Sequence, residues 1–564
     1  MARRFLRAAA LLGALSVIIA ACGSATPGGP AGSSGASVVT TNEPVPYGGT
    51  ITIGAAEEPD CFDWIGQCAG SQWGSWMAQY ATVPMAFRTV VKDGKVTEAP
   101  GAVLAGMPKF ETDPVETITY DIAPAAEWSD GVPISCADFQ YTESQIQNGS
   151  DIYDSTGYTD IDSVTCPTPK TVVVKYKKGK TYAGWHQLFA SSAGILPAHL
   201  LKGKDRDKAL KNGYTWSGGP WFAKWNKGDS IVLTPNPNYW GPKAHLDKVV
   251  FKIEADTAAA FQAFRSHQID AIYPQPQIDV VDAIKAGIPD ANTVYQSKTA
   301  SIEALWFNLG SAPFNSKPFR QAVGYAIDRD VIVNKLFGAL GVTKAVNSLN
   351  PSVIADYSDP NAWARYTLNL DKVNELMSGD GWAKGADGIW TKDGKRAAFT
   401  IATTAGNKRR ELTEQIIQPM LKAAGFDMTI KNATIDTLFG NMSSGNYDVN
   451  LLGQSLTSLT PGLCSVLCTE NIPTAANDNS GNNWSFGGVP AADVQLRIVD
   501  NSLDDAARKA AAAKADDILA DYNVALPLDP LPDILIWDKK IVGPVSDNPI
   551  EGMFWNIDQW GVKQ

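Results

Sequence analysis

Hydrophobic and polar residues follow two different periods along the chain, and the change from one to the other is clearest at residues 301–329. Residues 302–308 are apolar and aromatic enough to form a buried strand. Apolar residues then recur at the spacing of a helix face, and Pro318 suits the first turn of that helix. The pattern predicts a strand that leads directly into a helix. The residues of the helix face are Phe319, Ala322, Val323, Ala326 and Ile327.

Two side chains near the end of this predicted strand are candidates for ligand contact. They are Trp306 and Asn308, and α/β proteins bind ligands at the ends of strands. The alternative is an ordinary strand and helix inside a hydrophobic core, which residue type alone favours.

The same alternation of periods continues on both sides of this stretch. A rhythm of strand, helix and strand is typical of an α/β lobe. Because 564 residues exceed the ~250–300 at which a single core stops growing, we expect at least two lobes. Short apolar or alternating runs predict strands at residues 48–54, 117–122, 172–176, 249–253, 398–403 and 447–453, and longer periodic runs predict helices at residues 412–424 and 504–522.

The first 21 residues have the three-part composition of a secretory signal peptide, in which arginines are followed by an apolar run and then by small residues. The apolar run, residues 8–20, is shorter than the roughly 20 residues that span a bilayer. The sequence Ile19-Ala20-Ala21-Cys22 resembles a bacterial lipobox, so we expect a lipoprotein signal peptide at residues 1–21 and a lipid on Cys22. The alternative is a plain signal peptide with an incidental cysteine.

Residues 22–44 are rich in Gly, Ser, Ala, Pro and Thr and lack apolar periodicity. Such a segment cannot bury enough surface to fold, so we expect a flexible tether. A lipid on this tether would hold an exported domain at the outer side of the cell membrane.

The net charge of −11 and the absence of a dense basic run after the signal segment argue against nucleic acid or an anionic lipid surface as a partner. A hydrophobic content of 44% and a charged content of 19% are typical of a globular protein.

Six cysteines remain besides Cys22, an even number that suits three disulfides in an exported chain. Six cysteines can pair in 15 ways, and we expect nearest neighbours to pair because each such pair lies within one local segment. A metal site is the alternative, but Cys464 and Cys468 have no third cysteine and no histidine nearby, so we expect no metal site. The expected pairs are Cys61–Cys68, Cys136–Cys166 and Cys464–Cys468.

Several motifs resemble one known family. Residues 127–139, EWSDGVPISCADF, are similar to a W-S-D-G signature that opens a helix, although here Cys136 intervenes. Residues 236–241, NPNYWG, and the stretch LWFNLGSAPFNSKPFRQAVGYAIDR follow in the same order. Together they resemble the family 5 bacterial solute-binding proteins, the peptide and nickel binders of ABC importers.

The resemblance implies an α/β fold of the two-lobed periplasmic-binding-protein type II class, with an extra subdomain in the first lobe. On this basis we expect lobe I at residues 45–300, its subdomain at about residues 85–215, lobe II at residues 301–532, and a return to lobe I at residues 533–564. The expected function is a lipid-anchored receptor that closes its lobes over an oligopeptide or a related small solute and presents it to ABC permease subunits. We expect a monomer without a cofactor.

The sequence departs from the peptide binders of this family at one informative point. Those proteins carry an Asp shortly after the strand predicted here at residues 447–453, where it pairs with the α-ammonium of a peptide, whereas this chain has no acid before Glu470. A ligand with a free amine is therefore in doubt, because a charge-assisted hydrogen bond would be lost. The expected ligand-binding residues are Trp64, Trp306, Asn308, Gln454, Ser455 and Trp484.

Trp64 has a second interpretation, because it lies near Trp73 and Trp76 in the sequence and three such rings also suit a buried core cluster. Two alternative functions remain as well. A secreted hydrolase is possible in principle, but the chain has no G-x-S-x-G or H-E-x-x-H motif, and Gly179-Lys180-Thr181 lacks the first glycine of a phosphate loop. We therefore expect no catalytic residues. A sensor for a membrane signalling partner would have the same fold as the receptor.

Overall fold

A computed structural model describes residues 38–39, 44–69, 71–92, 95–149, 151–191, 193–274, 277–296, 299–477, 479–543 and 545–563. The predicted signal peptide, the lipid attachment at Cys22 and most of the predicted tether lie outside the described residues. Two residues of the predicted tether form a strand instead: β1 (Val38–Val39) pairs antiparallel with β24 (Val545–Ser546).

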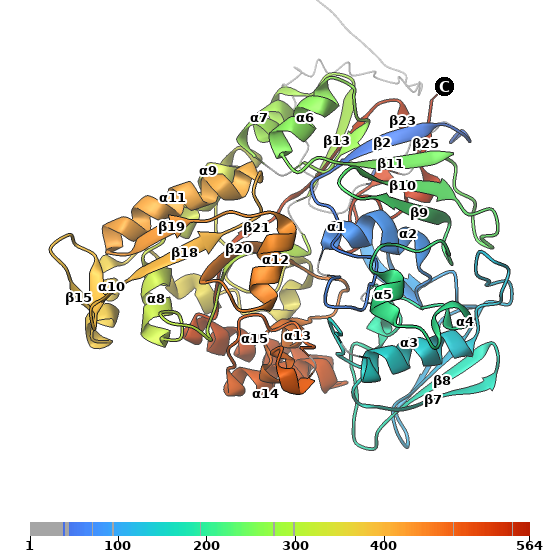
Figure 1. The fold of residues 1–564 in the computed structure, drawn as a ribbon, viewed down its shortest axis with the longest axis horizontal. Helices are drawn as coiled ribbons and strands as arrows, with labels where there is room; N and C mark the ends of the chain where they lie inside the picture. Colours follow the sequence, from blue (N-terminus) through green and yellow to red (C-terminus); the bar gives the residue numbers. More distant parts are fainter. Residues whose placement is uncertain are drawn as a thin grey trace, which may run out of the picture. The chain divides into compact units, whose positions relative to one another are not determined.

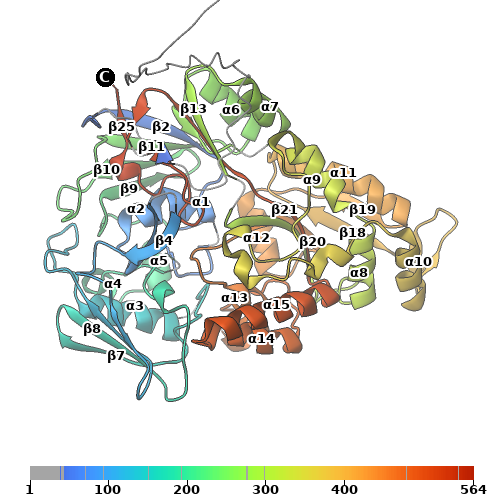
Figure 2. The same ribbon diagram turned by 180° about the vertical axis from the view of Figure 1, so that it is seen from behind.

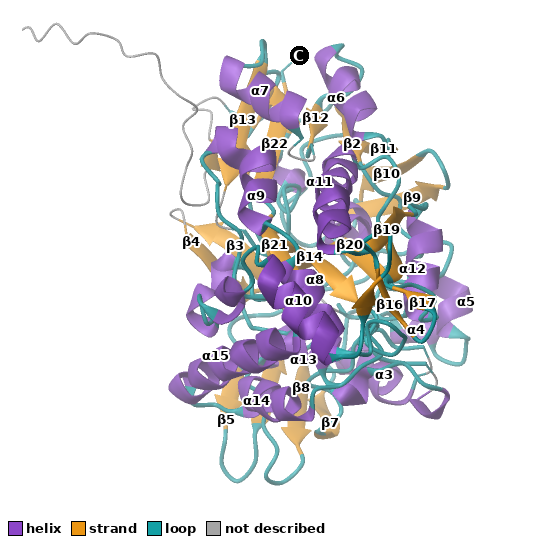
Figure 3. Ribbon diagram, turned by 90° about the vertical axis from the view of Figure 1, so that its left-hand side faces the viewer, coloured by secondary structure: helices purple, strands orange, loops and turns teal. Residues whose placement is uncertain are grey.

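The first large sheet has seven strands in the order β13-β22-β12-β2-β11-β10-β9 (Figure 1). Its central strand β2 pairs in parallel with both β11 and β12, and Ile51 and Ile53 of β2 are fully buried. Helices α6 (Thr257–Arg265) and α7 (Ile278–Ala286) pack their apolar residues against β12 and β22 (Figure 3). The strands are β2 (Thr50–Ala55), β9 (Trp221–Asn226), β10 (Ser230–Pro235), β11 (Lys248–Ile253), β12 (Ala271–Ile272), β13 (Ala291–Gln296) and β22 (Asp533–Asp538).

The second large sheet has five strands in the order β19-β18-β20-β14-β21. A hydrophobic core of its own surrounds it, separate from the core of the first sheet. The strands are β14 (Ser301–Phe307), β18 (Ala398–Ala402), β19 (Asp427–Ile430), β20 (Val449–Ser455) and β21 (Ala525–Pro530). The helices are α8 (Lys317–Tyr325), α9 (Arg329–Phe337), α10 (Leu370–Gly379), α11 (Lys408–Ala424), α12 (Ile435–Ser443), α13 (Leu463–Leu467), α14 (Pro490–Asn501) and α15 (Asp505–Tyr522).

The chain passes between the two sheets twice. It leaves the first sheet after β13 and enters the second at β14, and it returns between Pro530 of β21 and Asp533 of β22. Figure 2 shows the red segment after β21 running back toward the sheet that contains β2 and β11. We call the part of the chain around the first sheet the first half and the part around the second sheet the second half.

A third group of elements belongs to the first half. A four-stranded antiparallel sheet of order β5-β6-β8-β7 and the hairpin β3-β4 share the hydrophobic core of the first large sheet. Its elements are β3 (Phe87–Lys92), β4 (Lys95–Pro100), β5 (Lys109–Glu111), β6 (Thr117–Asp121), β7 (Ile161–Thr168), β8 (Thr171–Tyr176), α3 (Cys136–Asn148), α4 (Ala198–Leu201) and α5 (Arg206–Leu210).

Shorter elements complete the described chain. Three short helical segments follow one another in the first half: α1 (Gln72–Gly74), one turn of π-helix (Ser75–Gln79), called the π turn below, and α2 (Tyr80–Thr82). Strand β23 (Ile541–Val542) pairs with β25 (Gly561–Val562). In the second half, β15 (Ala383–Lys384), β16 (Trp390–Lys392) and β17 (Lys395–Arg396) form a small sheet.

Most of the predicted local features are confirmed. The strand and helix predicted at residues 301–329 are β14 and α8, and Pro318 lies in the first turn of α8. The W-S-D-G motif leads into helix α3 as expected, and Ser135 and Asp138 form a capping box at its start. The helix predicted at residues 412–424 is part of α11, which Gly425 ends in the left-handed conformation. The three expected disulfides, Cys61–Cys68, Cys136–Cys166 and Cys464–Cys468, are all present.

Two predicted strands are displaced along the sequence, and the first, expected at residues 48–54, is β2 at Thr50–Ala55. The strand expected at residues 447–453 is β20, which runs from Val449 to Ser455. Its pairing with β14, in which Ser455 lies opposite Ser301, extends the strand at its carboxyl end. Gln454 and Ser455 therefore belong to the strand itself.

Among the described residues, no helix combines the length and the apolar composition needed to cross a bilayer.

Candidate ligand-binding site

A cavity of about 320 Å³ lies between the two halves. The first half contributes the loop after β2, the region from α1 through the π turn, and residues 153–154. The second half contributes β14, β20, α12 and the loops at residues 456–466 and 482–485. The volume is at the lower end of the 300–1,000 Å³ that is typical of small-molecule sites.

Strands β14 and β20 place three of the predicted residues on the cavity wall. Trp306, Gln454 and Ser455 all line it. The indole N–H of Trp306 donates to the carbonyl oxygen of Leu452 at 3.1 Å, which fixes the ring. The hydroxyl oxygens of Ser455 and Ser301 lie 2.7 Å apart. The antiparallel pairing of the two strands brings Ser301 and Ser455 together although they are 154 positions apart in the sequence.

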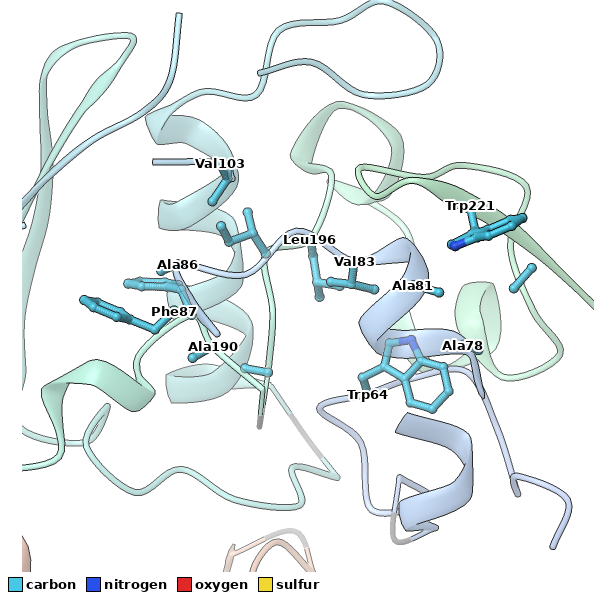
Figure 4. Close-up of a cluster of buried hydrophobic side chains, with 14 of the residues drawn as sticks. Trp64, Ala78, Ala81, Val83, Ala86, Phe87, Val103, Ala190, Leu196 and Trp221 are labelled. Atoms are coloured by element: carbon cyan, nitrogen blue, oxygen red, sulfur yellow. The ribbon is translucent and has the colours of Figure 1, made fainter. Parts of the chain in front are cut away.

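Trp64 combines both interpretations of its sequence context. It lines the cavity, together with Trp73 and Trp76, and it is also only 3% exposed and belongs to the core of the first half. Figure 4 shows its ring beside the helical segment that carries Ala78 and Ala81. Its indole N–H donates to the hydroxyl of Tyr214 at 2.8 Å.

Trp484 lines the cavity from the second half. Its ring meets Tyr153 of the first half edge-on, with ring centroids 6.0 Å apart, and meets Phe439 of α12 at 5.8 Å. Although Trp484 is only 8% exposed, its indole N–H has no hydrogen-bond partner among the described residues. The indole nitrogen is therefore a buried donor that no described residue satisfies.

Asn308 is not brought into the cavity. It is buried, and its amide nitrogen donates to the carbonyl oxygens of Gly445 at 3.0 Å and Tyr447 at 2.8 Å. Its amide oxygen accepts the N–H of Gly310 at 3.1 Å. The side chain joins the end of β14 to the segment before β20, and these contacts occupy its polar atoms.

Two acidic residues that were not predicted from the sequence also line the cavity. Glu57 follows β2, and Asp154 lies in the segment that packs against the second half. Burial raises the pKa of the Glu57 carboxyl even though Arg410 opposes the shift, and burial also raises the pKa of Asp154. The position of Glu57 just after a central strand is a signal that the sequence carried, since ligands bind at strand ends.

The third charged side chain on the wall, Arg410 of α11, belongs to a buried ionic cluster. Its Nε lies 3.1 Å and 3.2 Å from the two carboxylate oxygens of Glu303 on β14. Arg409 forms a second ion pair with the same carboxylate. Burial by itself would raise the pKa of Glu303, but the two guanidinium groups hold that pKa below its ordinary value.

Direct hydrogen bonds join the two halves around the cavity. The amide nitrogen of Gln67 donates to the carbonyl oxygens of Asn479 at 2.9 Å and Gly481 at 2.7 Å. The backbone N–H of Gly481 donates to the carbonyl oxygen of Ile152 at 3.1 Å. The hydroxyl of Ser191, which lines the cavity, donates to the carbonyl oxygen of Thr457. The structure is thus a closed form in which both halves contact each other.

Comparison with known sequences agrees with this architecture. Residues 102–462 match the family described as bacterial extracellular solute-binding proteins, family 5 middle. The oligopeptide-binding protein AppA of Bacillus subtilis is 27% identical over 295 residues, which cover 50% of this chain and 52% of AppA. Protein XP55 of Streptomyces lividans is 24% identical over 418 residues, which cover 73% of this chain and 72% of that protein. The chain spans about half the length of the first curated relatives that it matches.

Solved structures share the fold over nearly the whole chain. The structure of AppA from Bacillus subtilis in complex with a nonapeptide has a TM-score of 0.81 at 20% identity, and the match covers 92% of this chain and 100% of AppA. NikZ from Campylobacter jejuni in complex with Ni(L-His) has a TM-score of 0.75 at 20% identity, with coverage of 91% and 99%. The two-lobed periplasmic-binding-protein type II fold expected from the sequence is therefore confirmed, and the chain belongs to family 5 of the bacterial extracellular solute-binding proteins.

Proposed function

We propose that this protein is the solute receptor of an ABC importer and that it captures a small solute by closing its two halves over it. The observation that carries the proposal is the cavity of about 320 Å³ whose wall is shared by both halves. Hinge closure around a ligand is the known mechanism of periplasmic binding proteins. A ligand that contacts both halves binds the closed form more strongly and therefore shifts the equilibrium toward it.

The proposed division of the chain follows the two passages between the sheets. Lobe I comprises residues 45–300, with a subdomain at about residues 85–215, and also the returning segment 533–564. Lobe II comprises residues 301–532. In support, each large sheet has its own hydrophobic core and only two connections join them. Rotation at these two connections would open the cavity without disturbing either core.

The proposed ligand contacts come from five of the six residues predicted from the sequence. They leave out Asn308, whose amide is already bound within the second half. The aromatic rings supply apolar contact area, and Gln454 and Ser455 supply hydrogen-bonding groups, a combination that is typical of small-molecule sites. The five residues are Trp64, Trp306, Gln454, Ser455 and Trp484.

The size of the cavity restricts the ligand. A cavity of about 150 Å³ is large enough to hold benzene, and the cavity here is about 320 Å³. We therefore propose a ligand of roughly the size of a dipeptide. AppA, by comparison, was solved with a nonapeptide.

The receptor's remaining properties follow from the sequence and the family. We propose that a lipid on Cys22 anchors the protein at the outer side of the cell membrane, that it delivers solute to ABC permease subunits as a monomer, and that it leaves the solute chemically unchanged. Mass spectrometry of an intact membrane extract would test the lipid: a mature chain that begins at unmodified Cys22, or at any other residue, contradicts the anchor.

Tryptophan fluorescence during titration with pools of peptides, sugars and amines tests the receptor function. Several tryptophans line the cavity, so a solute that closes the halves around them should change the emission in a saturable way. Mass spectrometry of the recovered solute should show it unaltered. A protein that responds to none of these pools, or that converts the solute, contradicts the proposal.

A further inference from the structure

We infer that the solute of this receptor is a small organic cation without a free carboxylate, such as an amine or a quaternary ammonium compound, and that Glu57 and Asp154 are its anchors. This inference rests on the proposed function. It concerns the charge of the ligand, which neither the family nor the named relatives specify for this chain.

Acidic side chains outnumber basic ones among the described residues of the cavity wall. Among the described residues that line the cavity, the charged side chains are Glu57, Asp154 and Arg410. The two acids come from separate segments of the first half, and both are half-buried. The wall therefore has two carboxylates and one guanidinium.

The guanidinium of Arg410 already forms an ion pair with the carboxylate of Glu303. Arg410 shares the carboxylate of Glu303 with Arg409, and Asp529 lies close enough to act on both arginines. Burial raises the pKa of Asp529 to about 7, so Glu303, whose pKa is lowered, is the main carboxylate that neutralises these arginines. A ligand carboxylate that entered the cavity would find its only described cation engaged in this cluster.

The carboxyl groups of Glu57 and Asp154 have few hydrogen-bond partners among the described residues. No hydrogen bond or ion pair reaches the Glu57 carboxylate from the described residues, and Asp154 accepts only from residue Thr156, whose N–H lies at 2.8 Å. Burial raises the pKa of both carboxyls, although the charge of Arg410 opposes the shift at Glu57 and the hydrogen bonds from Thr156 oppose it at Asp154, because a carboxylate taken out of water needs a counter-charge. A cationic ligand would supply it.

The aromatic lining of the cavity suits a cationic ligand. Tyr273 meets Trp73 and Trp76 with ring centroids 5.9 Å and 5.4 Å apart, and all three rings line the cavity. The face of an aromatic ring attracts a cation, and clusters of such rings recognise quaternary ammonium groups.

These observations change what the sequence indicated about amines. The acid that pairs with a peptide α-ammonium in related proteins is absent after β20, but Glu57 and Asp154 bring carboxylates to the cavity from the other half. A free amine is therefore accommodated, whereas the free carboxylate of an ordinary peptide is not.

Matched probes that differ only in charge test this inference. The first pair is choline and its uncharged carbon analogue dimethylbutanol, and the second pair is Gly-Leu amide and Gly-Leu, which differ in the terminal carboxylate. Affinities are measured by calorimetry at low ionic strength on the intact mature protein. We expect the cationic member of each pair to bind roughly tenfold or more tightly, because a charge-assisted contact to a buried carboxylate is among the stronger ones.

Isosteric variants connect the preference to the two anchors. Glu57→Gln and Asp154→Asn should each remove most of the preference for the cationic probes, while Glu375→Gln, an exposed acid on α10, should keep it. Circular dichroism checks that each variant is folded. If Glu57→Gln or Asp154→Asn is unfolded, the comparison of the probe pairs on the natural protein still decides the question.

The inference is overturned if dimethylbutanol or Gly-Leu binds as well as its cationic partner, if none of the four probes binds, or if both folded anchor variants keep the preference. The receptor function fails separately if the fluorescence titration finds no solute in any pool or if the recovered solute is chemically altered. A protein that binds a neutral or acidic solute would thus retain the proposed function and refute the cationic ligand.

Discussion

Glu303 and Glu57 are two carboxylates in one neighbourhood that have opposite electrostatic environments. Glu303 is buried behind the cavity wall in the second half, where it pairs with Arg409 and Arg410, and its pKa is lowered. Glu57 lines the cavity from the first half and forms no ion pair with the described residues, and burial raises its pKa against the opposing charge of Arg410. Burial is common to both, so the difference comes from the partners. The two carboxylates thus differ because the protein itself supplies the ion pairs of Glu303 and, among the described residues, supplies none to Glu57.

The largest effect should come from breaking the completed pair. Glu303→Gln leaves two buried guanidinium groups without their shared carboxylate, so the free energy of unfolding should fall by about 3–5 kcal/mol in urea titrations. The exposed pair between Glu470 and Arg497, 2.6 Å apart, provides the control. Glu470→Gln should change the free energy by about 1 kcal/mol or less. Equal losses of stability in the two variants would show that the buried ion pairs of Glu303 matter no more than the exposed pair of Glu470.

A smaller effect should come from weakening the contact between the halves. Gln67→Ala removes the hydrogen bonds to the carbonyl oxygens of Asn479 and Gly481, which exist only in the closed form. At about 0.5–1.5 kcal/mol for each bond, ligand affinity should fall by about tenfold, with little change in the stability of either half. Calorimetry and thermal melting measure the two quantities.

Gln147→Ala is the matched control, because the amide of Gln147 donates to the carbonyl oxygens of Tyr158 and Ile161 within the first half. It should lower the melting temperature and leave the affinity unchanged. The reverse pattern, with affinity lost in the control and retained in Gln67→Ala, would show that these cross-half bonds do not support closure.

The smallest effect, and one of opposite sign, is expected at Glu57. A carboxyl whose pKa is raised in the folded state binds its proton more tightly there, so it contributes stability at acid pH that is lost as the pH rises through the raised pKa. Without ligand, Glu57→Gln should therefore melt at the same temperature as the natural protein or higher, and its advantage should grow from acid toward alkaline pH. A destabilised variant whose deficit grows with pH would indicate a hidden partner for Glu57.

Local features of the fold could be predicted from the sequence because nearby residues determine them. Pro318 and the apolar spacing after it fix the start of α8, Ser135 and Asp138 cap α3, and the local cysteine pairs form as expected. The end of β20 was displaced by two residues because its pairing with β14, far away in the sequence, sets its length.

The candidate site could be predicted only in part, because its wall forms where two distant parts of the chain meet. Trp306, Gln454 and Ser455 reach the cavity as their positions at strand ends indicated. Asn308 does not, since the turn around it takes up its amide. Glu57 was not identified although its position just after a central strand carried a signal, and Asp154 was not identified because an acid in a loop has no pattern that reveals whether the other half will cover it.

Small-angle X-ray scattering of the mature protein, with and without the solute found in the fluorescence titration, most directly tests whether the halves close over a ligand. Saturation should reduce the radius of gyration, and Gln67→Ala should require more solute to reach the same reduction. Scattering curves that stay unchanged when the cavity is shown by calorimetry to be fully occupied would contradict closure.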